Sequence, residues 1–251
     1  MILGWILRFR NLLHTYLWGV SVPLPPAITA EIAPGILLDS RRALVHQAQG
    51  WMAVADLHYG YEVHRSRQGA LLPHWGMGQC RATLLSLLHD HRPQKLIIVG
   101  DIMDGSGSVA QTGAFLDNLR TYVPELILIE GNHDRSGLKK GWHLQKTHRE
   151  EAFVFHHGHQ GIAPPSLGQD LFAQHSQVTF ITGHEHPAIS LRDGAGMKLK
   201  LPAMVQQRLS PEMQHWILPA FSPWASGGEY RSEHENLATW ACTPARIWKI
   251  G

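Results

Sequence analysis

Five short motifs built largely from aspartate, histidine and asparagine occur in a fixed order along this 251-residue chain. They are Asp56-Leu57-His58, Gly100-Asp101-Ile102-Met103-Asp104, Gly131-Asn132-His133-Asp134, His157-Gly158-His159 and Gly183-His184-Glu185-His186. Their carboxylate, amide and imidazole groups supply enough oxygen and nitrogen ligands for two metal ions. A pair of metal ions in one site is suited to the cleavage of phosphate esters.

The ligand types and their spacing define the metal chemistry further. Asp56 and His58 alternate on an extended segment, so both side chains can reach one ion while Leu57 points into the core. The two oxygens of one carboxylate, such as that of Asp101, can bridge two cations. Mixed imidazole and carboxylate ligation suits Mn, Fe, Zn or Co and disfavours Ca or Mg. We expect two divalent ions, with manganese first among these candidates.

The motifs differ in how specific they are. Asp-x-His alone is weak evidence for a metal site, because such a fragment often arises by chance. A fixed tetrapeptide such as Gly131-Asn132-His133-Asp134 occurs about once in 10⁵ positions when each residue has a usage near 5%. The occurrence of all five motifs in this order by chance is negligible.

Each motif follows the end of an apolar segment that predicts a β-strand. The expected strands cover residues 51–55, 95–99, 125–129, 152–155 and 178–182, a hairpin covers 36–38 and 43–45, and helices cover 80–91 and 109–122. In open α/β sheets, ligand sites gather at the carboxyl edge because the loops converge there. Motifs that are far apart in sequence are therefore expected to meet in space.

The composition indicates a folded domain with a weak overall charge. Hydrophobic residues make up 44% of the chain, and the net charge is +2. This charge does not require a nucleic-acid partner. The two cysteines, Cys80 and Cys242, form no metal motif and are expected to be reduced thiols in a cytoplasmic protein.

The first residues differ from the rest of the chain in their pattern of apolar and charged residues. We expect residues 1–27 to be an amphipathic extension and linker, and residues 28–251 to be one catalytic domain. Arg8, Arg10 and His14 interrupt the apolar run, which argues against a signal peptide or membrane span. Residues 1–20 are expected to form a helix that packs on the domain or mediates a homo-oligomer. A membrane-surface anchor is the alternative.

The order of the five motifs resembles that of the calcineurin-like metallophosphoesterase superfamily, over residues 35–228. The resemblance implies an α/β fold, a four-layer α-β-β-α sandwich with two mixed sheets. It implies one metal site made of Asp56, His58, Asp101 and His186, and a second made of Asp101, Asn132, His157 and His184.

The resemblance also implies roles for residues that bind no metal. His133 would face the scissile phosphate as a catalytic residue, and Asp134 would orient it. Asp104 would either support the ligand residues without binding metal or shape the loop. His159 and His156 are expected to lie outside the ligand set, in solvent or in packing.

A narrower resemblance concerns the PdeM type, which is similar to the SbcD nuclease subunit and often linked to a DNA ligase. It rests on residues 55–62, on residues 183–188 and on Leu218-Pro219-Ala220-Phe221. It implies phosphodiester substrates, such as DNA or nucleotides, and DNA-repair proteins as partners. Tyr61 departs from the pattern, because those proteins carry lysine there.

Two alternatives stay open beside a phosphodiesterase or nuclease. One is a phosphomonoesterase acting on a small metabolite. The other is a scaffold that kept the fold and lost the chemistry, against which the complete ligand set and His133 speak. Trp216, Phe221 and Trp224 would either stack a nucleobase or pack in the protein, and packing is the expectation.

Overall fold

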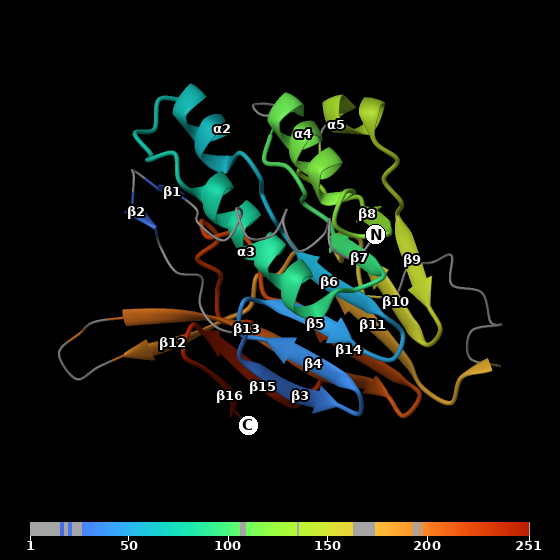
Figure 1. Ribbon diagram of the computed structural model, residues 1–251. Coiled ribbons are helices and arrows are strands. Elements are labelled where there is room, and N and C mark those ends of the chain that lie inside the picture. The colour runs from blue at the N-terminus through green and yellow to red at the C-terminus, as the bar shows by residue number, and fades with distance from the viewer. Residues whose placement is uncertain are drawn as a thin grey trace.

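Two β-sheets pack face to face, and helices cover the outer side of one of them (Figure 1). The computed structural model describes residues 16–17, 20–21, 27–105, 109–134, 136–162, 174–192, 196 and 198–250. The two-sheet α/β architecture expected from the sequence is confirmed.

The first sheet has six strands in the order β3-β4-β5-β6-β7-β8. Its strands are β3 (Thr29–Ala33), β4 (Ile36–Asp39), β5 (Ala43–His46), β6 (Trp51–Ala55), β7 (Lys95–Val99) and β8 (Glu125–Ile129). The predicted hairpin is confirmed as the antiparallel pair of β4 and β5. Strands β6, β7 and β8 run parallel, so their carboxyl ends share one edge.

The second sheet has eight strands in the order β16-β15-β13-β14-β11-β10-β9, and β12 pairs with β13 beside this path. Its strands are β9 (Thr147–Glu150), β10 (Phe153–His156), β11 (Val178–Thr182), β12 (Ala188–Arg192), β13 (Lys198–Ser210), β14 (Met213–Ile217), β15 (Glu235–Thr243) and β16 (Arg246–Ile250). Strands β10, β11 and β14 are parallel neighbours. Both sheets are therefore mixed.

The described helices lie on the six-stranded sheet (Figure 1). They are α2 (Tyr61–Arg67), α3 (Gly76–His91), α4 (Val109–Leu119) and α5 (Ser136–Gly141). Among the residues that the structure describes, no helix covers the outer face of the eight-stranded sheet, where Val154, Val178 and Phe180 cluster.

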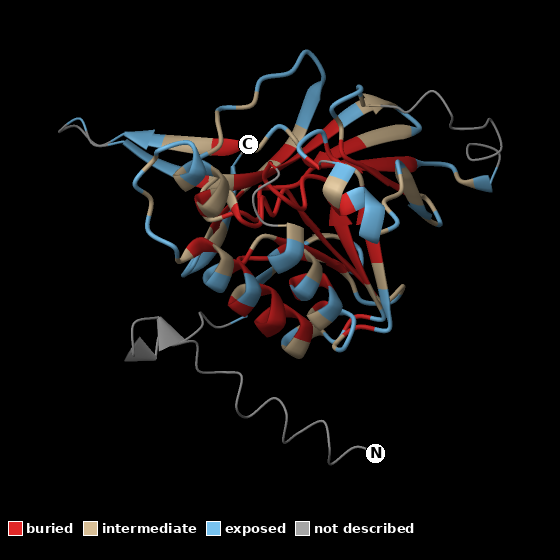
Figure 2. Ribbon diagram, turned by 90° about the horizontal axis from the view of Figure 1, so that it is seen from above, coloured by how far each residue is buried: buried red, intermediate tan, exposed pale blue. Residues whose placement is uncertain are grey.

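Side-chain alternation along the central strands builds two cores. In β6, Met52 and Val54 pack toward the helices, whereas Trp51, Ala53 and Ala55 pack toward the second sheet. Burial on both faces explains why this strand is apolar throughout. Figure 2 shows the buried residues concentrated in the strands and on the inner sides of the helices.

Helix α3 begins four residues before the predicted start at Cys80. The backbone N–H of Met77 donates a hydrogen bond of 2.7 Å to the buried carboxylate of Glu62. This remote cap satisfies one of the free N–H groups of the first turn, which the local sequence does not reveal.

The predicted helix over residues 1–20 lies mostly outside the described residues. Where the chain is described, Tyr16–Leu17 (β1) and Val20–Ser21 (β2) form a short antiparallel pair. The helical prediction is therefore wrong at these positions, where aromatic and β-branched residues favour strands. Within the described part of the chain, no helix has the length and apolar character needed to cross a membrane.

His215 on β14 makes the stability of the fold depend on pH. Its buried ring contacts Thr182 Oγ1 at 2.8 Å, and burial lowers its pKa to about 3. In the unfolded chain a histidine has a pKa near 6.5, so the unfolded state binds more protons as the pH falls below that value. This contribution to stability is complete above about pH 6.5 and is lost as the pH falls toward 3.

The unfolding free energy of the wild type is expected to fall between pH 7 and pH 5. We predict that this fall is smaller by about 2 kcal/mol in His215→Gln. Urea unfolding at the two pH values measures it. His143→Gln, at an exposed histidine, is the matched control. Equal pH dependence in the two variants would refute the assignment to His215.

Candidate metal centre

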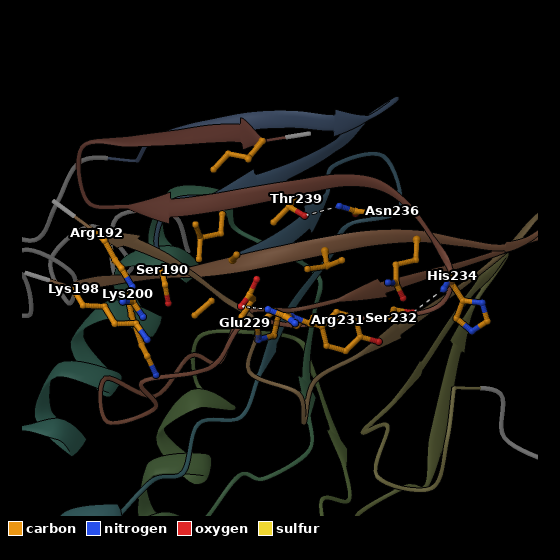
Figure 3. Close-up of a pocket in the computed structure, with 18 residues that line it drawn as sticks. Ser190, Arg192, Lys198, Lys200, Glu229, Arg231, Ser232, His234, Asn236 and Thr239 are labelled. Atoms are coloured by element: carbon orange, nitrogen blue, oxygen red, sulfur yellow. Dashed lines mark hydrogen bonds and ion pairs between the residues drawn. The ribbon is translucent and has the colours of Figure 1, made fainter. Parts of the chain in front are cut away.

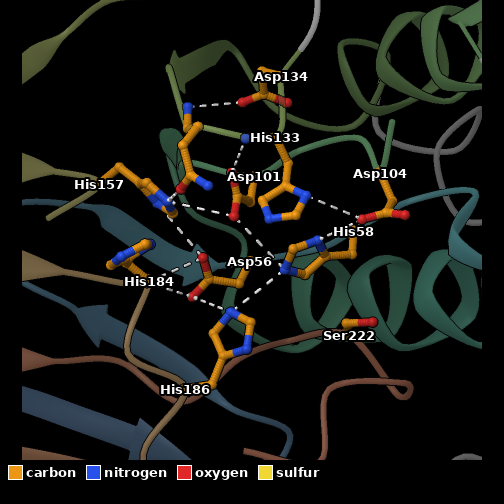
Figure 4. A network of polar contacts seen from close by, with 12 residues as sticks. Asp56, His58, Asp101, Asp104, His133, Asp134, His157, His184, His186 and Ser222 are labelled. Carbon is orange, nitrogen blue, oxygen red and sulfur yellow. Dashed lines mark hydrogen bonds and ion pairs between the residues drawn. The ribbon is translucent and has the colours of Figure 1, made fainter. Parts of the chain in front are cut away.

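The five motifs meet where the carboxyl ends of the parallel strands of both sheets come together (Figure 4). Asp56 directly follows β6, and Gly100-Asp101 follows β7. The Asn132 motif comes after β8, whereas His157 and His184 follow β10 and β11. The predicted placement of the motifs at strand ends is confirmed.

A left-handed backbone turns the side chains of these strand ends inward. Asp56, His58, Asp101, His184 and His186 have φ between 43° and 70°, and they are five of the eight described non-glycine residues with positive φ. Such a conformation costs about 1–3 kcal/mol per residue and is found mainly at functional sites. The strain is therefore concentrated in the predicted ligand residues.

The motif glycines are required because the site side chains approach their backbone closely. A Cβ atom on Gly100 would lie 2.0 Å from His157 Nδ1, and one on Gly131 would lie 2.2 Å from Asp101 Oδ1. One on Gly183 would lie 2.5 Å from Asp56 Oδ2. All three distances are far below van der Waals contact.

One cluster of potential ligands consists of Asp56, His58 and His186. The Nε2 atoms of the two histidines face each other at 3.4 Å, and His186 Nε2 lies 3.6 Å from Asp56 Oδ2. Asp56 is fully buried and also accepts a hydrogen bond from the backbone N–H of His184. The imidazole lone pairs and the carboxylate thus converge on one point.

A second cluster consists of Asp101, His157 and His184, with Asn132 beside it. His157 Nε2 lies 2.8 Å from Asn132 Oδ1 and 3.4 Å from Asp101 Oδ2. The same Asp101 oxygen lies 3.7 Å from His58 Nε2 in the first cluster. Asp101 therefore lies between the two clusters, as the prediction of a shared ligand requires.

The electrostatics of the centre favour bound positive charge. Burial opposes ionisation of Asp101, but hydrogen bonds from His157 and from the His133 backbone N–H hold its pKa at about 2. Burial also opposes protonation of His58 and His157, yet neighbouring carboxylates raise both pKa values. Surroundings that stabilise a proton on these imidazoles also suit a divalent cation, so the residues fit the implied metal pair.

Asp104 is the carboxylate that contacts His133. Its Oδ1 lies 3.4 Å from His133 Nδ1 and 3.3 Å from His58 Nδ1. The side chain of His133 is 47% exposed, so its ring is accessible from solvent. The sequence predicted that Asp104 would either support the ligand residues without binding metal or shape the loop, but its spacing does not reveal that His133 is its partner.

Asp134 has a different set of contacts from the one expected. Its buried carboxylate accepts hydrogen bonds from the backbone N–H groups of Gly131 at 2.8 Å and Met103 at 3.0 Å. Burial outweighs these bonds and raises its pKa to about 6. Asp134 thus joins two loops of the centre.

The remaining histidines lie around the ligand clusters. His159 is exposed, with its ring 5.3 Å from that of His157. His156 is buried and contacts the carbonyl oxygen of Ile162 at 2.7 Å, as expected for a packing role. Arg135 lies outside the described residues.

The aromatic residues considered for base stacking serve packing. Phe221 and Trp216 are each only 3% exposed and belong to the cores. The ring of Trp224 packs against Trp75 at 4.7 Å and against Tyr61 at 5.9 Å. Tyr61, which replaces the lysine of similar proteins, is thus part of a packed aromatic group.

Arg42 is a supporting residue that the sequence did not reveal. Its guanidinium donates hydrogen bonds to the carbonyl oxygens of Ala220 at 2.9 Å and Ser222 at 3.1 Å. The backbone N–H of Ser222 in turn donates to the carbonyl oxygen of Asp56. No motif surrounds Arg42, and only the fold connects it to the site.

The two-sheet fold and its paired aspartate–histidine clusters define a metal-dependent hydrolase. The sequence matches the calcineurin-like phosphoesterase family over residues 52–244. This match spans most of the chain, so the protein belongs to the calcineurin-like phosphoesterase family and is a metal-dependent phosphoesterase. The family resemblance is confirmed.

Solved structures are similar to this chain at low sequence identity. Nuclease MPE from Pseudomonas putida is 22% identical, with a TM-score of 0.59, and the alignment covers 90% of this chain and 100% of that chain. The E. coli phosphoesterase YfcE is 16% identical, with a TM-score of 0.39 and coverage of 76% and 86%. Comparison with curated proteins gives no match.

We predict that Gly131→Ala weakens Mn²⁺ binding at least tenfold and lowers the unfolding free energy by about 1–3 kcal/mol, because the new methyl group displaces Asp101. Metal titration and urea unfolding measure the two effects. Gly141→Ala is the matched control, since nothing lies within 4 Å of a Cβ at that position. Unchanged metal affinity in Gly131→Ala would contradict the proposed role of the close approach.

Proposed function

We propose that this enzyme hydrolyses phosphodiesters of nucleic acids or nucleotides with two divalent metal ions. The observation that carries the proposal is the pair of aspartate–histidine clusters joined at Asp101, with the exposed ring of His133 beside them. A phosphate group bound there would meet both clusters and a proton donor together.

Seven residues would hold the metal ions. One ion would take Asp56, His58, Asp101 and His186, and the other would take Asp101, Asn132, His157 and His184. Such ions supply positive charge that stabilises the transition state and lower the pKa of water enough to provide a nucleophile near neutral pH. The mixed nitrogen and oxygen donors support Mn, and next Fe, Zn or Co.

His133 would act on the leaving group. Asp104 holds Nδ1 of the imidazole, which leaves Nε2 directed away from this carboxylate. From Nε2 the ring would donate a proton to the leaving oxygen or a hydrogen bond to the developing charge. The backbone N–H of His133 also donates to Asp101 Oδ1 at 2.8 Å, which ties the catalytic ring to the metal ligands.

The nucleic-acid part of the proposal is supported by the sequence resemblance and by the nuclease name of the Pseudomonas putida structure with the same fold. The cytoplasmic location, the DNA-repair partners and the N-terminal extension over residues 1–27 stay predictions from the sequence.

Phosphomonoester hydrolysis is the competing activity. A panel of bis-p-nitrophenyl phosphate, p-nitrophenyl phosphate, cyclic nucleotides and DNA with Mn²⁺ decides between them. Turnover of monoesters alone would overturn the proposal.

We predict that the wild-type chain binds two Mn²⁺ ions and that Asp101→Asn lowers the occupancy of both sites. The shared carboxylate offsets the repulsion between two dications, and an amide does not. Elemental analysis after Mn²⁺ loading and gel filtration measures the stoichiometry. One ion per wild-type chain, or the loss of only one ion in Asp101→Asn, would show that Asp101 is not shared.

His133→Ala is expected to retain metal while losing diester turnover by about 10²–10⁴-fold, the usual contribution of a positioned acid. Asp104→Asn should lower turnover in the same direction but less, because His133 remains. Steady-state rates and metal content are measured on the same preparations. His159→Ala, at the exposed histidine outside the clusters, is the control and should leave turnover within about twofold of the wild type. Metal loss in His133→Ala would mean that His133 is a ligand.

A further inference from the structure

A cavity lies near the metal centre, between the β12–β13 hairpin and the segment 229–236 (Figure 3). Its volume is about 830 Å³. Ala203, Val205 and Gln207 of β13 and Thr239 of β15 form part of its lining. A cavity of this size is within the range that binds small ligands in proteins.

The cavity and the metal centre share one segment of backbone. Pro187 and Ala188 line the cavity and directly follow the predicted ligand His186. The N–H of Gly228 donates to the carbonyl oxygen of His186 at 3.1 Å, and the N–H of Ala188 donates to that of Gly228 at 2.7 Å. The lining of the cavity therefore begins one residue after a predicted metal ligand.

The hairpin presents a cluster of cations to this cavity. Arg192 lies directly opposite Lys198, and Ser190 lies opposite Lys200, so all four share one face of the hairpin. Like charges in opposite positions destabilise an antiparallel pair. Among the described residues, no carboxylate forms an ion pair with Arg192 or Lys198.

The far side of the cavity is polar and includes one aromatic side chain. Arg231 is paired with Glu229 at 3.0 Å, which neutralises both charges. Ser232 and Asn236 provide neutral hydrogen-bonding groups, and Tyr230 provides a ring. Proteins that hold single strands combine a basic groove with aromatic rings in this way.

We propose that this cavity binds the phosphate backbone of a single nucleic-acid strand as it leaves the metal centre, with Arg192 and Lys198 as the phosphate contacts. The inference rests on the proposed phosphodiesterase function and adds a binding site to it. A bound phosphate offsets the repulsion between the two facing cations, whereas a neutral ligand does not.

The test compares strand binding by two charge-matched variants. Arg192→Gln with Lys198→Gln removes the hairpin pair, and Arg92→Asn with Arg246→Gln removes two exposed cations elsewhere. Asparagine suits position 92 because Arg92 has a φ of 46°. Both doubles also carry His133→Ala, so that the metal-loaded protein leaves the strand intact. Anisotropy of a fluorescent oligothymidylate gives affinity as a function of salt.

The hairpin double is expected to bind at least tenfold more weakly than the control double. Its plot of log affinity against log salt should be shallower by about 1.4, because two phosphate contacts to a single strand are lost. Equal affinities and slopes in the two doubles would overturn the inference.

Two further measurements separate the inference from folding and from the proposed function. In the His133→Ala single variant, bound oligothymidylate should protect Lys198 from acylation but not Lys249, which lies over the Trp240 ring. Full reactivity of Lys198 in the complex would refute the cavity even if the double variant misfolds. The control double with His133 intact should hydrolyse bis-p-nitrophenyl phosphate at the wild-type rate. Absence of that activity in the wild type would refute the diesterase proposal instead.

Discussion

The left-handed backbone at the strand ends is the constraint on which the rest of the site depends. A strand that continued in extended conformation past Ala55 or Val99 would carry Asp56 and Asp101 away from the shared edge. With φ values of 55° and 43°, the chain bends there and both carboxylates enter the centre. The bend is strained for any residue with a Cβ, so the packed sheets must hold it in place. The rigid scaffold is therefore what makes the ligand geometry possible.

The neighbouring glycines follow from the same constraint. Once the strand ends bend inward, the ligand side chains press against the backbone of the next strand end. Gly100 accommodates His157 in this way, and Gly131 accommodates Asp101. Gly100, Gly131 and Gly183 thus each make room for a residue of another motif, distant in sequence. These close approaches explain why motifs that are far apart in the chain form one site.

The strands and the convergence of the motifs were predictable from the sequence, because apolar runs end directly before each motif. Burial on both faces made β6 and β7 unmistakable, and their predicted bounds agree with the structure. The pairing of Asp104 with His133 and the support from Arg42 were not predictable. Both depend on contacts between segments that no sequence period connects. The same holds for the start of α3, which is capped by Glu62 from a different helix.

The two sheets contribute different chemistry to the centre. The six-stranded sheet supplies the carboxylates, Asn132 and His58, whereas His157, His184 and His186 follow strands of the eight-stranded sheet or its connections. Ions bound by ligands from both sheets would connect the sheets at their common edge. The apolar core connects the two sheets away from this edge. An ion that binds only the folded state stabilises that state by mass action. Metal affinity and the packing of the two sheets are therefore parts of one equilibrium, and a residue that disturbs either one is expected to change the other.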